Sequence, residues 1–353
     1  MTRIEEIFEK ESFAMLKLPF SDRVKAIWPE DGASEKLDPY KIAQTPKEGF
    51  LMMPFDTEGG TPSTIIWADN EAFFDVHGDW RTEMRCGDEV PNDEERLLYA
   101  ERFATFIGAI HSGEFQKLVL SRQSISEGGI SDEELLKAYE CACATYPRMM
   151  VYIVREKNFG TWIGCTPEIL IAGDGKEYKT VALAGTVPYG ADLELAWNPK
   201  NRLEQAIVAD FVRERLRPLS AEIIENGPYT ARAGHLAHIK TEFTIRPNDA
   251  FNIGAAISKL HPTPAVCGLP QAKSKQFIKM NEGYDRTYYS GAVGLVGPDK
   301  EVNLFVNLRC AKIEARRVIF YAGGGLVEGS TDESEWRETC TKMDTLRRII
   351  VTE

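Results

Sequence analysis

Short apolar runs, many of them alternating with polar residues, dominate the chain from residue 117 onward and predict strands. The runs are KLVLSR (117–122), MMVYIVRE (149–156), TWIGCTPEILIAG (161–173), YKTVALAGT (178–186), GHLAHIKTEF (234–243), NLFVNLRCAKI (303–313) and RVIFYAGGG (317–325). Several follow one another in pairs, joined by tight connections such as GDGKE (173–177) and VGPDKE (296–301). Because tight connections join antiparallel neighbours, the sheets are expected to be largely antiparallel.

Helical patterns fall between and after these runs, near 92–110, 132–144, 200–219, 248–260, 271–282 and 331–350. This mixture predicts an α+β fold rather than a doubly wound sheet. Residues 1 to about 100 are richer in Pro, Gly and acidic side chains and have weak periodicity, so we expect them to wrap or edge the main body. No repeat, low-complexity tract or Pro/Ser linker separates independent domains.

The chain of 353 residues is acidic, with 42 Lys and Arg against 54 Asp and Glu and a net charge of −12. Such a protein repels phosphate backbones and anionic lipids, which argues against non-specific binding to nucleic acid or membranes. An anionic substrate would need a few placed cations or a metal ion. No run reaches about 18 uncharged apolar residues and the N-terminus is acidic, so a cytoplasmic protein is expected.

Cysteines and histidines form no recognisable metal or nucleophile motif. The cysteines are odd in number and mostly lie among apolar neighbours, which favours reduced core thiols: Cys86, Cys141, Cys143, Cys165, Cys267, Cys310 and Cys340. Cys141 and Cys143 have no second pair or nearby histidine, so a metal site there is disfavoured. No H-E-x-x-H pattern includes any of the histidines His77, His111, His235, His238 and His261, and no G-x-S-x-G elbow occurs.

The glycine run Gly323 to Gly325 matches neither of the common phosphate-binding patterns. Two interpretations stay open for it. The run is either a turn after a strand or a place where main-chain N–H groups meet an anion closely.

The predicted C-terminal helix carries charged groups beside an apolar stripe. The stripe is formed by Trp336, Cys340, Met343, Leu346 and Ile350. Glu335, Glu338 and Lys342 lie together next to it, and Glu338 with Lys342 has the spacing of a surface ion pair. Glu204 holds a similar position on another predicted helix. Two carboxylates from separate helices, with water and substrate oxygens, would suit Mg²⁺, whereas zinc fits poorly without His or Cys.

Two ionisable residues stand in apolar strand surroundings. Lys117 is either an edge-strand lysine that prevents aggregation or a desolvated amine able to act as a base. Glu168 is either a solvated strand-end acid or a buried carboxyl that stays protonated and acts as a general acid.

An ordered set of motifs then resembles the chorismate-utilising enzymes, most closely the branch of isochorismate and salicylate synthases. The motifs are KLVLSR, TPEILIAG, LAGT, NRLEQAIV, HPTPAVCG, EGYDRTYYSGAVG, NLRCAK, AGGGLVEGS and EWRETCTK. They run from about residue 105 to the C-terminus. The resemblance implies a single α+β domain over 1–353, with two facing, largely antiparallel sheets and helices outside, in which 1–100 is a divergent portion.

The resemblance also implies a site. Glu204 and Glu338 correspond to Mg²⁺ ligands and Glu335 to a residue of the water shell, and the ion would hold the ring carboxylate of chorismate. Arg309, the anchor for the pyruvyl carboxylate, suits it because a guanidinium binds a carboxylate bidentately. The remaining substrate-binding positions are Gly185, Thr186, His238, Ala265, Tyr289, Gly323 and Lys342.

The same resemblance implies a reaction. Lys117 corresponds to the base that activates water and Glu168 to the acid that protonates the leaving C4 hydroxyl, so chorismate would become isochorismate. The aminating relatives have a lysine where Ala184 stands, so neither amination nor a glutaminase subunit is expected. Asn201 stands where the family often has an acid, three residues before Glu204, and this lowers the negative charge near the metal.

Other outcomes remain open at this stage. Salicylate synthase shares every residue just named, and a catalytically silent chorismate-binding protein would keep the same surface. The expected partner is the small molecule alone, bound by a monomer with Mg²⁺ and no organic cofactor. The product would enter menaquinone or siderophore biosynthesis.

Overall fold

The computed structural model describes residues 3–42, 45–77, 80, 93–189, 197, 199–233 and 236–350. Cys86 and His235 lie outside these residues. The other cysteines are free thiols, buried except for the half-buried Cys340, which confirms the expectation for them. Within the described ranges, no helix is long and apolar enough to cross a membrane.

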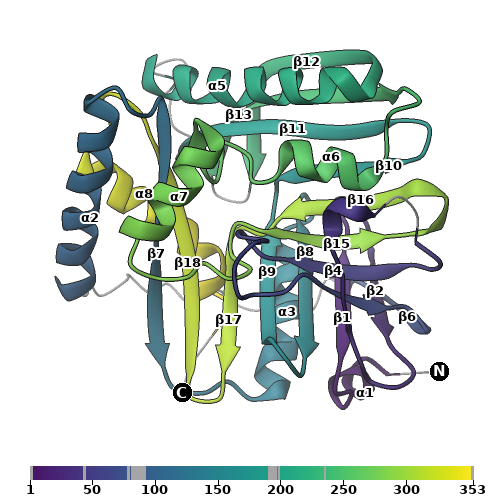
Figure 1. Ribbon diagram of the computed structural model, residues 1–353. Helices are drawn as coiled ribbons and strands as arrows, with labels where there is room; N and C mark the ends of the chain where they lie inside the picture. Colours follow the sequence, from purple (N-terminus) through teal and green to yellow (C-terminus); the bar gives the residue numbers. More distant parts are fainter. Residues whose placement is uncertain are drawn as a thin grey trace.

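Two sheets of nine described strands each face one another, and every strand pair is antiparallel (Figure 1). In spatial order the first sheet contains β14 (Gly268–Leu269), β7 (Lys117–Glu127), β18 (Arg317–Leu326), β17 (Cys310–Glu314), β9 (Gly160–Thr166), β8 (Met150–Glu156), β1 (Phe13–Lys17), β2 (Arg23–Trp28) and β6 (Asn70–Asp75). The second contains β12 (Ser220–Ala233), β13 (Leu236–Pro247), β11 (Tyr178–Pro188), β10 (Ile169–Asp174), β16 (Glu301–Val306), β15 (Ala292–Val296), β4 (Gly49–Met53), β5 (Thr64–Trp67) and β3 (Glu35–Lys36). The predicted α+β fold with two facing antiparallel sheets is therefore confirmed.

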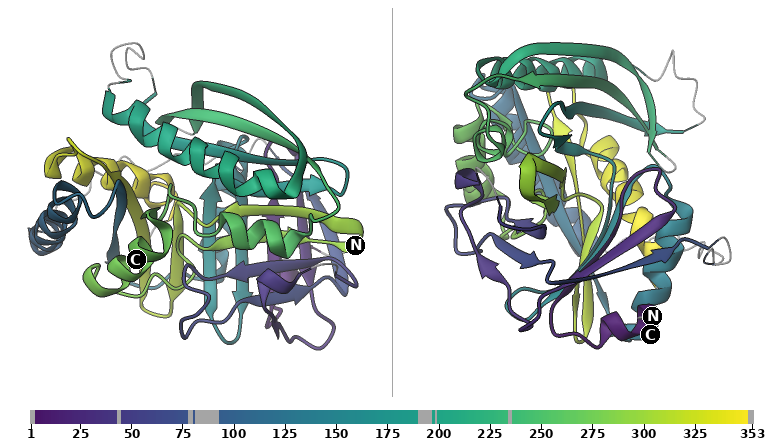
Figure 2. Two further views of the ribbon diagram at one scale, coloured as in Figure 1. Left: turned by 45° about the horizontal axis from the view of Figure 1, so that its top comes forward. Right: turned by 90° about the vertical axis from the view of Figure 1, so that its right-hand side faces the viewer.

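Helices cover the outer faces of the sheets (Figure 2). They are α1 (Ile4–Phe8), α2 (Asp93–His111), α3 (Asp132–Thr145), α5 (Pro199–Leu216), α6 (Ile253–Leu260), α7 (Gln271–Asn281) and α8 (Asp332–Arg347), with short 3-10 turns η1 (Pro39–Lys41), η3 (Arg217–Leu219) and η4 (Pro298–Lys300). α1, α3 and α8 bury apolar residues against the first sheet, and α5 and α6 do so against the second. A third cluster, which includes Tyr152 and Phe305, fills the space between the sheets.

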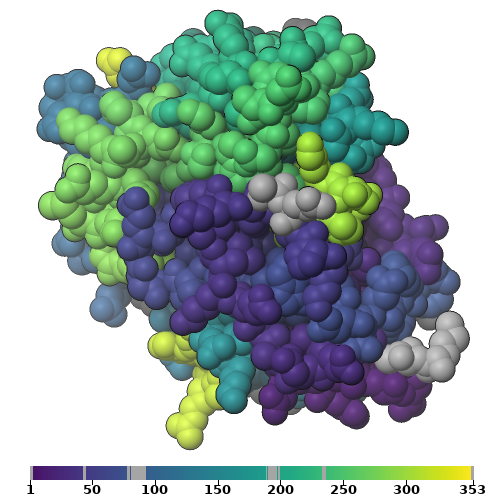
Figure 3. All heavy atoms as spheres, turned by 45° about the vertical axis from the view of Figure 1, so that its right-hand side comes forward, coloured from purple at the N-terminus to yellow at the C-terminus, as the bar shows by residue number. Residues whose placement is uncertain are grey.

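The N-terminal segment extends both sheets at one end. β1, β2 and β6 join the first sheet through β8, whereas β3, β4 and β5 join the second through β15. On the face in Figure 3 its purple and blue atoms lie directly beside the green atoms of the middle of the chain. The N-terminal segment therefore edges the main body, as expected, by pairing its strands with both sheets. The weak periodicity of its sequence did not predict these strands.

Two predicted strands are each divided between the sheets. The run 161–173 becomes β9 in the first sheet and β10 in the second, and the chain crosses at Pro167 and Glu168. The run 303–313 becomes β16 and β17, with a crossing that ends at Arg309. The crossings are neighbours, because Val306 N donates to Glu168 O at 2.9 Å and Cys165 N donates to Arg309 O at 3.0 Å. The two crossings between the sheets therefore bring Glu168 and Arg309 close together.

Other boundaries differ from the sequence expectations. The glycine run 323–325 lies within β18 and pairs with β7, so its interpretation as a turn was wrong. β12 was not predicted, because its residues are mostly exposed and carry no apolar alternation. α6 begins at Ile253 rather than at residue 248. Asn252 caps this start, because its side chain accepts a hydrogen bond from Ala255 N.

Candidate active site

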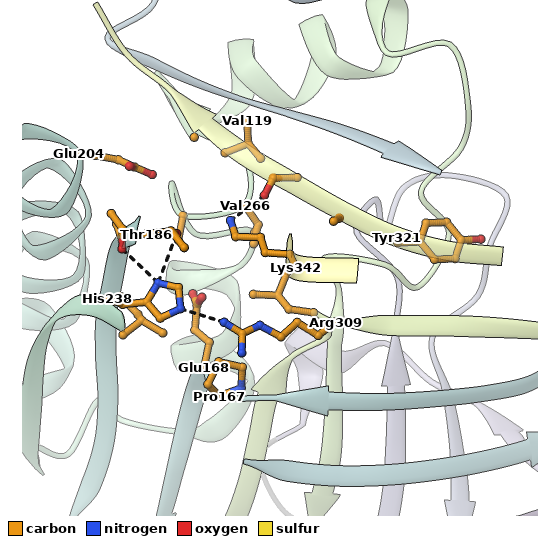
Figure 4. A pocket seen from close by; sticks show the side chains of 18 of the residues that line it. Val119, Pro167, Glu168, Thr186, Glu204, His238, Val266, Arg309, Tyr321 and Lys342 are labelled. Carbon is orange, nitrogen blue, oxygen red and sulfur yellow. Dashed lines mark hydrogen bonds between the residues drawn. The ribbon is translucent and has the colours of Figure 1, made fainter. Parts of the chain in front are cut away.

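One pocket, lined by β7 and β18 of the first sheet and β11 and β13 of the second, gathers most of the residues singled out from the sequence (Figure 4). It opens to solvent, and the empty space that it contains together with its mouth is about 630 Å³. Of the sequence-predicted residues, its lining contains Glu168, Gly185, Thr186, Glu204, His238, Ala265, Tyr289, Arg309, Gly323 and Lys342. Lys117, Glu335 and Glu338 lie directly behind this lining, next to Gly324 and Gly325.

Lys117 is a desolvated amine. β7 lies between β14 and β18, so the edge-strand interpretation of Lys117 was wrong, and the side chain is 0% exposed. Its Nζ lies 3.0 Å from Oε1 of Glu204, and among the described residues the amine has no hydrogen-bond acceptor. An amine so placed lacks the water shell that would otherwise stabilise its charge.

Glu168 is a buried acid at the first sheet crossing. It is 4% exposed, so its interpretation as a solvated strand-end residue was wrong. Burial raises the pKa of its carboxyl to about 7, although the positive charges of Lys117, Lys342 and Arg309 oppose the rise. The carboxyl therefore exchanges its proton near neutral pH, as a general acid requires.

His238 and Arg309 form a defined pair at the pocket floor. Arg309 Nη2 donates to His238 Nε2 at 2.8 Å, and His238 Nδ1 lies 3.1 Å from the carbonyl oxygen of Gly185. These contacts assign the proton to Nδ1, which donates to that oxygen. Burial and then the charge of Arg309 lower the pKa of His238 to about 3, so the imidazole is neutral.

Arg309 keeps its charge in this pocket. Burial lowers the pKa of its guanidinium to about 10, which still leaves it protonated at neutral pH. Its backbone has a φ of 47°, in the left-handed region that non-glycine residues rarely adopt. A buried cation on a strained backbone is typical of a residue positioned to bind an anion.

Lys342 extends the positive lining of the pocket. Its Nζ donates to the carbonyl oxygen of Gly323 at 2.8 Å and contacts Oε1 of Glu338 at 2.7 Å. The two side chains are 20% and 15% exposed, so the ion pair lies beside the pocket rather than on a solvated helix face. Gly323 must be small, because a β-carbon there would lie 2.9 Å from Ser121 Cβ and 3.0 Å from Tyr289 Oη.

Three carboxylates gather around the next two glycines. A β-carbon on Gly325 would lie 2.1 Å from Oε1 of Glu204, and one on Gly324 would lie 2.6 Å from Oε2 of Glu335 and 3.9 Å from Oε1 of Glu338. The absence of side chains at both glycines leaves room for these acids. α5 supplies one of them and α8 the other two. We call Glu204, Glu335 and Glu338 the acid cluster.

The acid cluster has the composition that a magnesium site requires. Within the described parts of the chain, no three acidic, histidine or cysteine side chains converge closely enough to hold a metal by themselves. Mg²⁺ usually takes only one or two protein carboxylates and keeps several waters, so this does not conflict with two ligands. Oε2 of Glu335 is buried without a hydrogen-bond partner in the part of the chain that the structure describes, an arrangement that a metal-bound water would relieve. The oxygen donors therefore fit Mg²⁺.

Sequence reasoning missed a buried pair that supports β7. Glu282 accepts hydrogen bonds from Ser121 N and Oγ, and Arg286 donates to Val119 O at 2.9 Å and to Val266 O at 2.7 Å. These side chains replace a neighbouring strand where β14 is too short to continue. Their i,i+4 spacing was the available signal. Tyr321 was also missed, and it lines the pocket and stacks on Tyr289 with ring centroids 5.3 Å apart.

Comparison with known proteins gives consistent matches. A family model described as chorismate binding enzyme matches residues 76–351. The salicylate biosynthesis isochorismate synthase of Pseudomonas aeruginosa is 30% identical over 267 residues, 73% of this chain and 55% of that protein. The isochorismate synthase DhbC of Bacillus subtilis is 32% identical over 279 residues, 74% of this chain and 69% of the relative. The chain thus spans about half the length of the Pseudomonas protein.

A solved structure agrees with the fold. The menaquinone-specific isochorismate synthase MenF of Escherichia coli superposes with a TM-score of 0.79 over 99% of this chain and 92% of that one, at 19% identity. The match of the family model from residue 76 to residue 351, together with relatives at 30% identity or more over nearly three quarters of the chain, shows that this protein belongs to the chorismate binding enzymes.

Proposed function

We propose that this protein is an isochorismate synthase, which converts chorismate to isochorismate by adding water at C2 and releasing the C4 hydroxyl. The observation that carries the proposal is the joint presence, in and directly behind one pocket lining, of the buried amine of Lys117 and the buried carboxyl of Glu168. A binding-only protein gains nothing from burying two ionisable groups, since both carry a desolvation cost. The relatives named isochorismate synthase support the same assignment.

The proposed step is a balanced substitution. Lys117, acting as the base, takes a proton from water as the water oxygen bonds to C2. The ring double bond shifts, and the C–O bond at C4 breaks as Glu168 gives its proton to the departing hydroxyl. Water is consumed and released, so no redox change occurs. Each general acid or base contributes roughly 10² to 10⁴ in rate.

Substrate binding follows from the cations of the pocket. Arg309 and Lys342 would hold the pyruvyl carboxylate, with Tyr289 and the main chain of Gly323 beside it. Glu204 and Glu338 would hold Mg²⁺, with Glu335 in its water shell. When bound, the ion supplies positive charge to the ring carboxylate, which the electronegative chain otherwise repels.

The lining supports water rather than ammonia as the nucleophile. Ala184, at the position where the resemblance gives aminating enzymes a lysine, lines the pocket with a methyl group. His238 is neutral, with both ring nitrogens engaged by Arg309 and Gly185. Lys117 thus remains the base of the proposed reaction.

Product analysis tests the proposal. The purified protein is incubated with chorismate and Mg²⁺, with and without ammonium, and the products are separated chromatographically. Isochorismate as the main product is the expected result, and chelation with EDTA should stop its formation. Salicylate with pyruvate would assign the protein to salicylate synthases instead. An ammonium-dependent aminated product, or no turnover despite chorismate binding, would contradict the proposal.

A further inference from the structure

Lys200, in the first turn of α5, contacts the acid cluster but has no task in the proposed reaction. Its Nζ lies 2.6 Å from Oε1 of Glu335 on α8, and Glu335 is 1% exposed. Lys200 does not line the pocket. The ion pair therefore joins two helices behind the site rather than facing the substrate.

Each acid of the cluster contacts one lysine. Lys117 lies 3.0 Å from Glu204, and Lys342 lies 2.7 Å from Glu338. With Lys200 on Glu335, three lysine side chains contact three acids. Lys117 and Lys342 have proposed roles toward water and substrate, so Lys200 is the lysine whose contact with the cluster is still unexplained.

The ammonium of Lys200 lies in the field of the whole cluster. Although burial opposes the charged form, the carboxylates of Glu335, Glu204 and Glu338 together raise the pKa of Lys200. The contact with Glu335 at 2.6 Å places this ammonium close to the position expected for a divalent cation. Two cations in one acid cluster repel each other, so each weakens the binding of the other.

The negative charge of Glu335 is offset by an ion pair at only one of its two carboxylate oxygens. Oε1 contacts Lys200, whereas Oε2 is buried against Gly324 and has no hydrogen-bond partner among the residues described in 3–350. If the lysine charge is removed, a buried carboxylate loses its counter-charge, which is among the more destabilising single changes. A bound divalent cation would restore that counter-charge.

We propose that Lys200 is the internal counter-ion of the acid cluster: its ammonium offsets the charge of Glu335 while no divalent cation is bound and so weakens the binding of Mg²⁺ to the free enzyme. This inference rests on the proposed function, which assigns the cluster to Mg²⁺. Chorismate brings two negative charges of its own, so the metal binds more tightly once the substrate is present. By linkage, the substrate gains equally from the metal.

Magnesium titration of the substrate-free protein tests the assignment. Lys200→Met removes the charge and keeps the length of the side chain, whereas Lys200→Arg keeps the charge. Lys137→Met is the matched control, because Lys137 forms an exposed ion pair with Glu133 at 2.7 Å on α3. By calorimetry, Lys200→Met should bind Mg²⁺ about tenfold more tightly than wild type, and both other variants within about threefold of it.

Thermal melting gives a second measurement on the same proteins. Lys200→Met should melt at a lower temperature than wild type without metal, and saturating Mg²⁺ should raise its melting temperature more. If the Met variant fails to fold, Lys200→Gln is measured in its place. Equal or weaker Mg²⁺ binding by the neutral variant, while wild type binds the ion, would overturn this inference and leave the proposed function intact.

A double-mutant cycle tests whether Lys200 acts through Glu335. In a Glu335→Gln background the substitution of Lys200 by Met should change Mg²⁺ affinity by clearly less than tenfold, because only the direct repulsion between the ammonium and the metal is then left to remove. A full tenfold effect in that background would overturn the pairing. If wild type turns over chorismate but binds no Mg²⁺ and needs none, the metal assignment itself fails, and with it this inference.

Discussion

Arg309 Nη2 donates a hydrogen bond to Nε2 of His238 at 2.8 Å. The other ring nitrogen of this histidine, Nδ1, contacts the carbonyl oxygen of Gly185 in the bulge of β11, so the imidazole links the guanidinium to that strand. Gly185 has a φ of 69°, and the pairing of β11 with β13 shifts register there. Bulges of this kind redirect side chains next to active sites. The neutral histidine thus orients the guanidinium without competing for the substrate's negative charge.

His238→Phe should therefore weaken substrate binding more than it slows chemistry. Without its acceptor, the guanidinium of Arg309 loses one fixed orientation, so KM for chorismate should rise about tenfold while kcat changes by less than about threefold. Steady-state kinetics measure both constants. The exposed His111, at the end of α2, provides the control His111→Phe, which should behave as wild type. A loss confined to kcat would contradict this role.

Lys117→Ala should abolish turnover by about 10³-fold or more while leaving Mg²⁺-dependent substrate binding largely intact, since the amine acts on water in the reaction step. Rapid-quench kinetics and equilibrium binding of chorismate separate the two effects. Lys312→Ala is a suitable control, because Lys312 lies on β17 in a partly exposed ion pair with Glu314. Unchanged turnover in Lys117→Ala would remove this lysine from the mechanism.

The rate should fall on the alkaline side of neutrality. Glu168 must be protonated to release the C4 hydroxyl, and burial sets the pKa of its carboxyl at about 7. kcat/KM should consequently decline tenfold per pH unit above about 7, where the free enzyme loses that proton. A pH profile in constant-ionic-strength buffers measures this limb. A profile that stays flat from pH 7 to about 9 would exclude Glu168 as the acid.

Glu168→Gln should stabilise the fold at alkaline pH even as it removes activity. The folded-state pKa of about 7 exceeds the ordinary value of 4.5, so the native protein holds the proton more tightly than the unfolded chain. That contribution is fully present below pH 4.5 and is lost as the pH rises through about 7. The ionised carboxylate then costs on the order of 3 kcal/mol, which glutamine avoids. Urea unfolding at pH 5 and pH 8.5 should show a gain for the variant only at the higher pH.

Gly325→Ala should disrupt the acid cluster. Its new β-carbon would lie 2.1 Å from Oε1 of Glu204 and 2.7 Å from Cε of Lys117, so both side chains must move. Loss of Mg²⁺ binding and of activity by about 100-fold or more is expected. Gly108→Ala is the matched control, because Gly108 lies within α2 and no described residue comes within 4 Å of an added β-carbon. Calorimetry with Mg²⁺ distinguishes the two, and normal binding by Gly325→Ala would refute the assignment.

Local sequence patterns were sufficient for much of the fold. The pattern of residues 132–144 predicted α3 almost to the residue, and in the structure a capping box of Ser131 and Glu134 marks its start. The connections 173–177 and 296–301 join antiparallel pairs as expected. β12 was missed because its exposed residues lack an apolar face, and the six N-terminal strands were missed because several are buried along their whole length and lose the alternation on which prediction depends.

The sequence by itself determined which chemical groups were available and, through the order of the motifs, the family to which they belong. It left Lys117 and Glu168 each with two opposite interpretations, because solvent exposure depends on neighbours far away in the chain. The tertiary structure decided both by burying each residue, the first on a strand that is paired on both sides and the second where the chain passes from one sheet to the other. Such burial changes the stability of charged forms, which no local pattern encodes. The contact between Lys200 and Glu335 could not be predicted from the sequence, because it forms only where α5 meets α8.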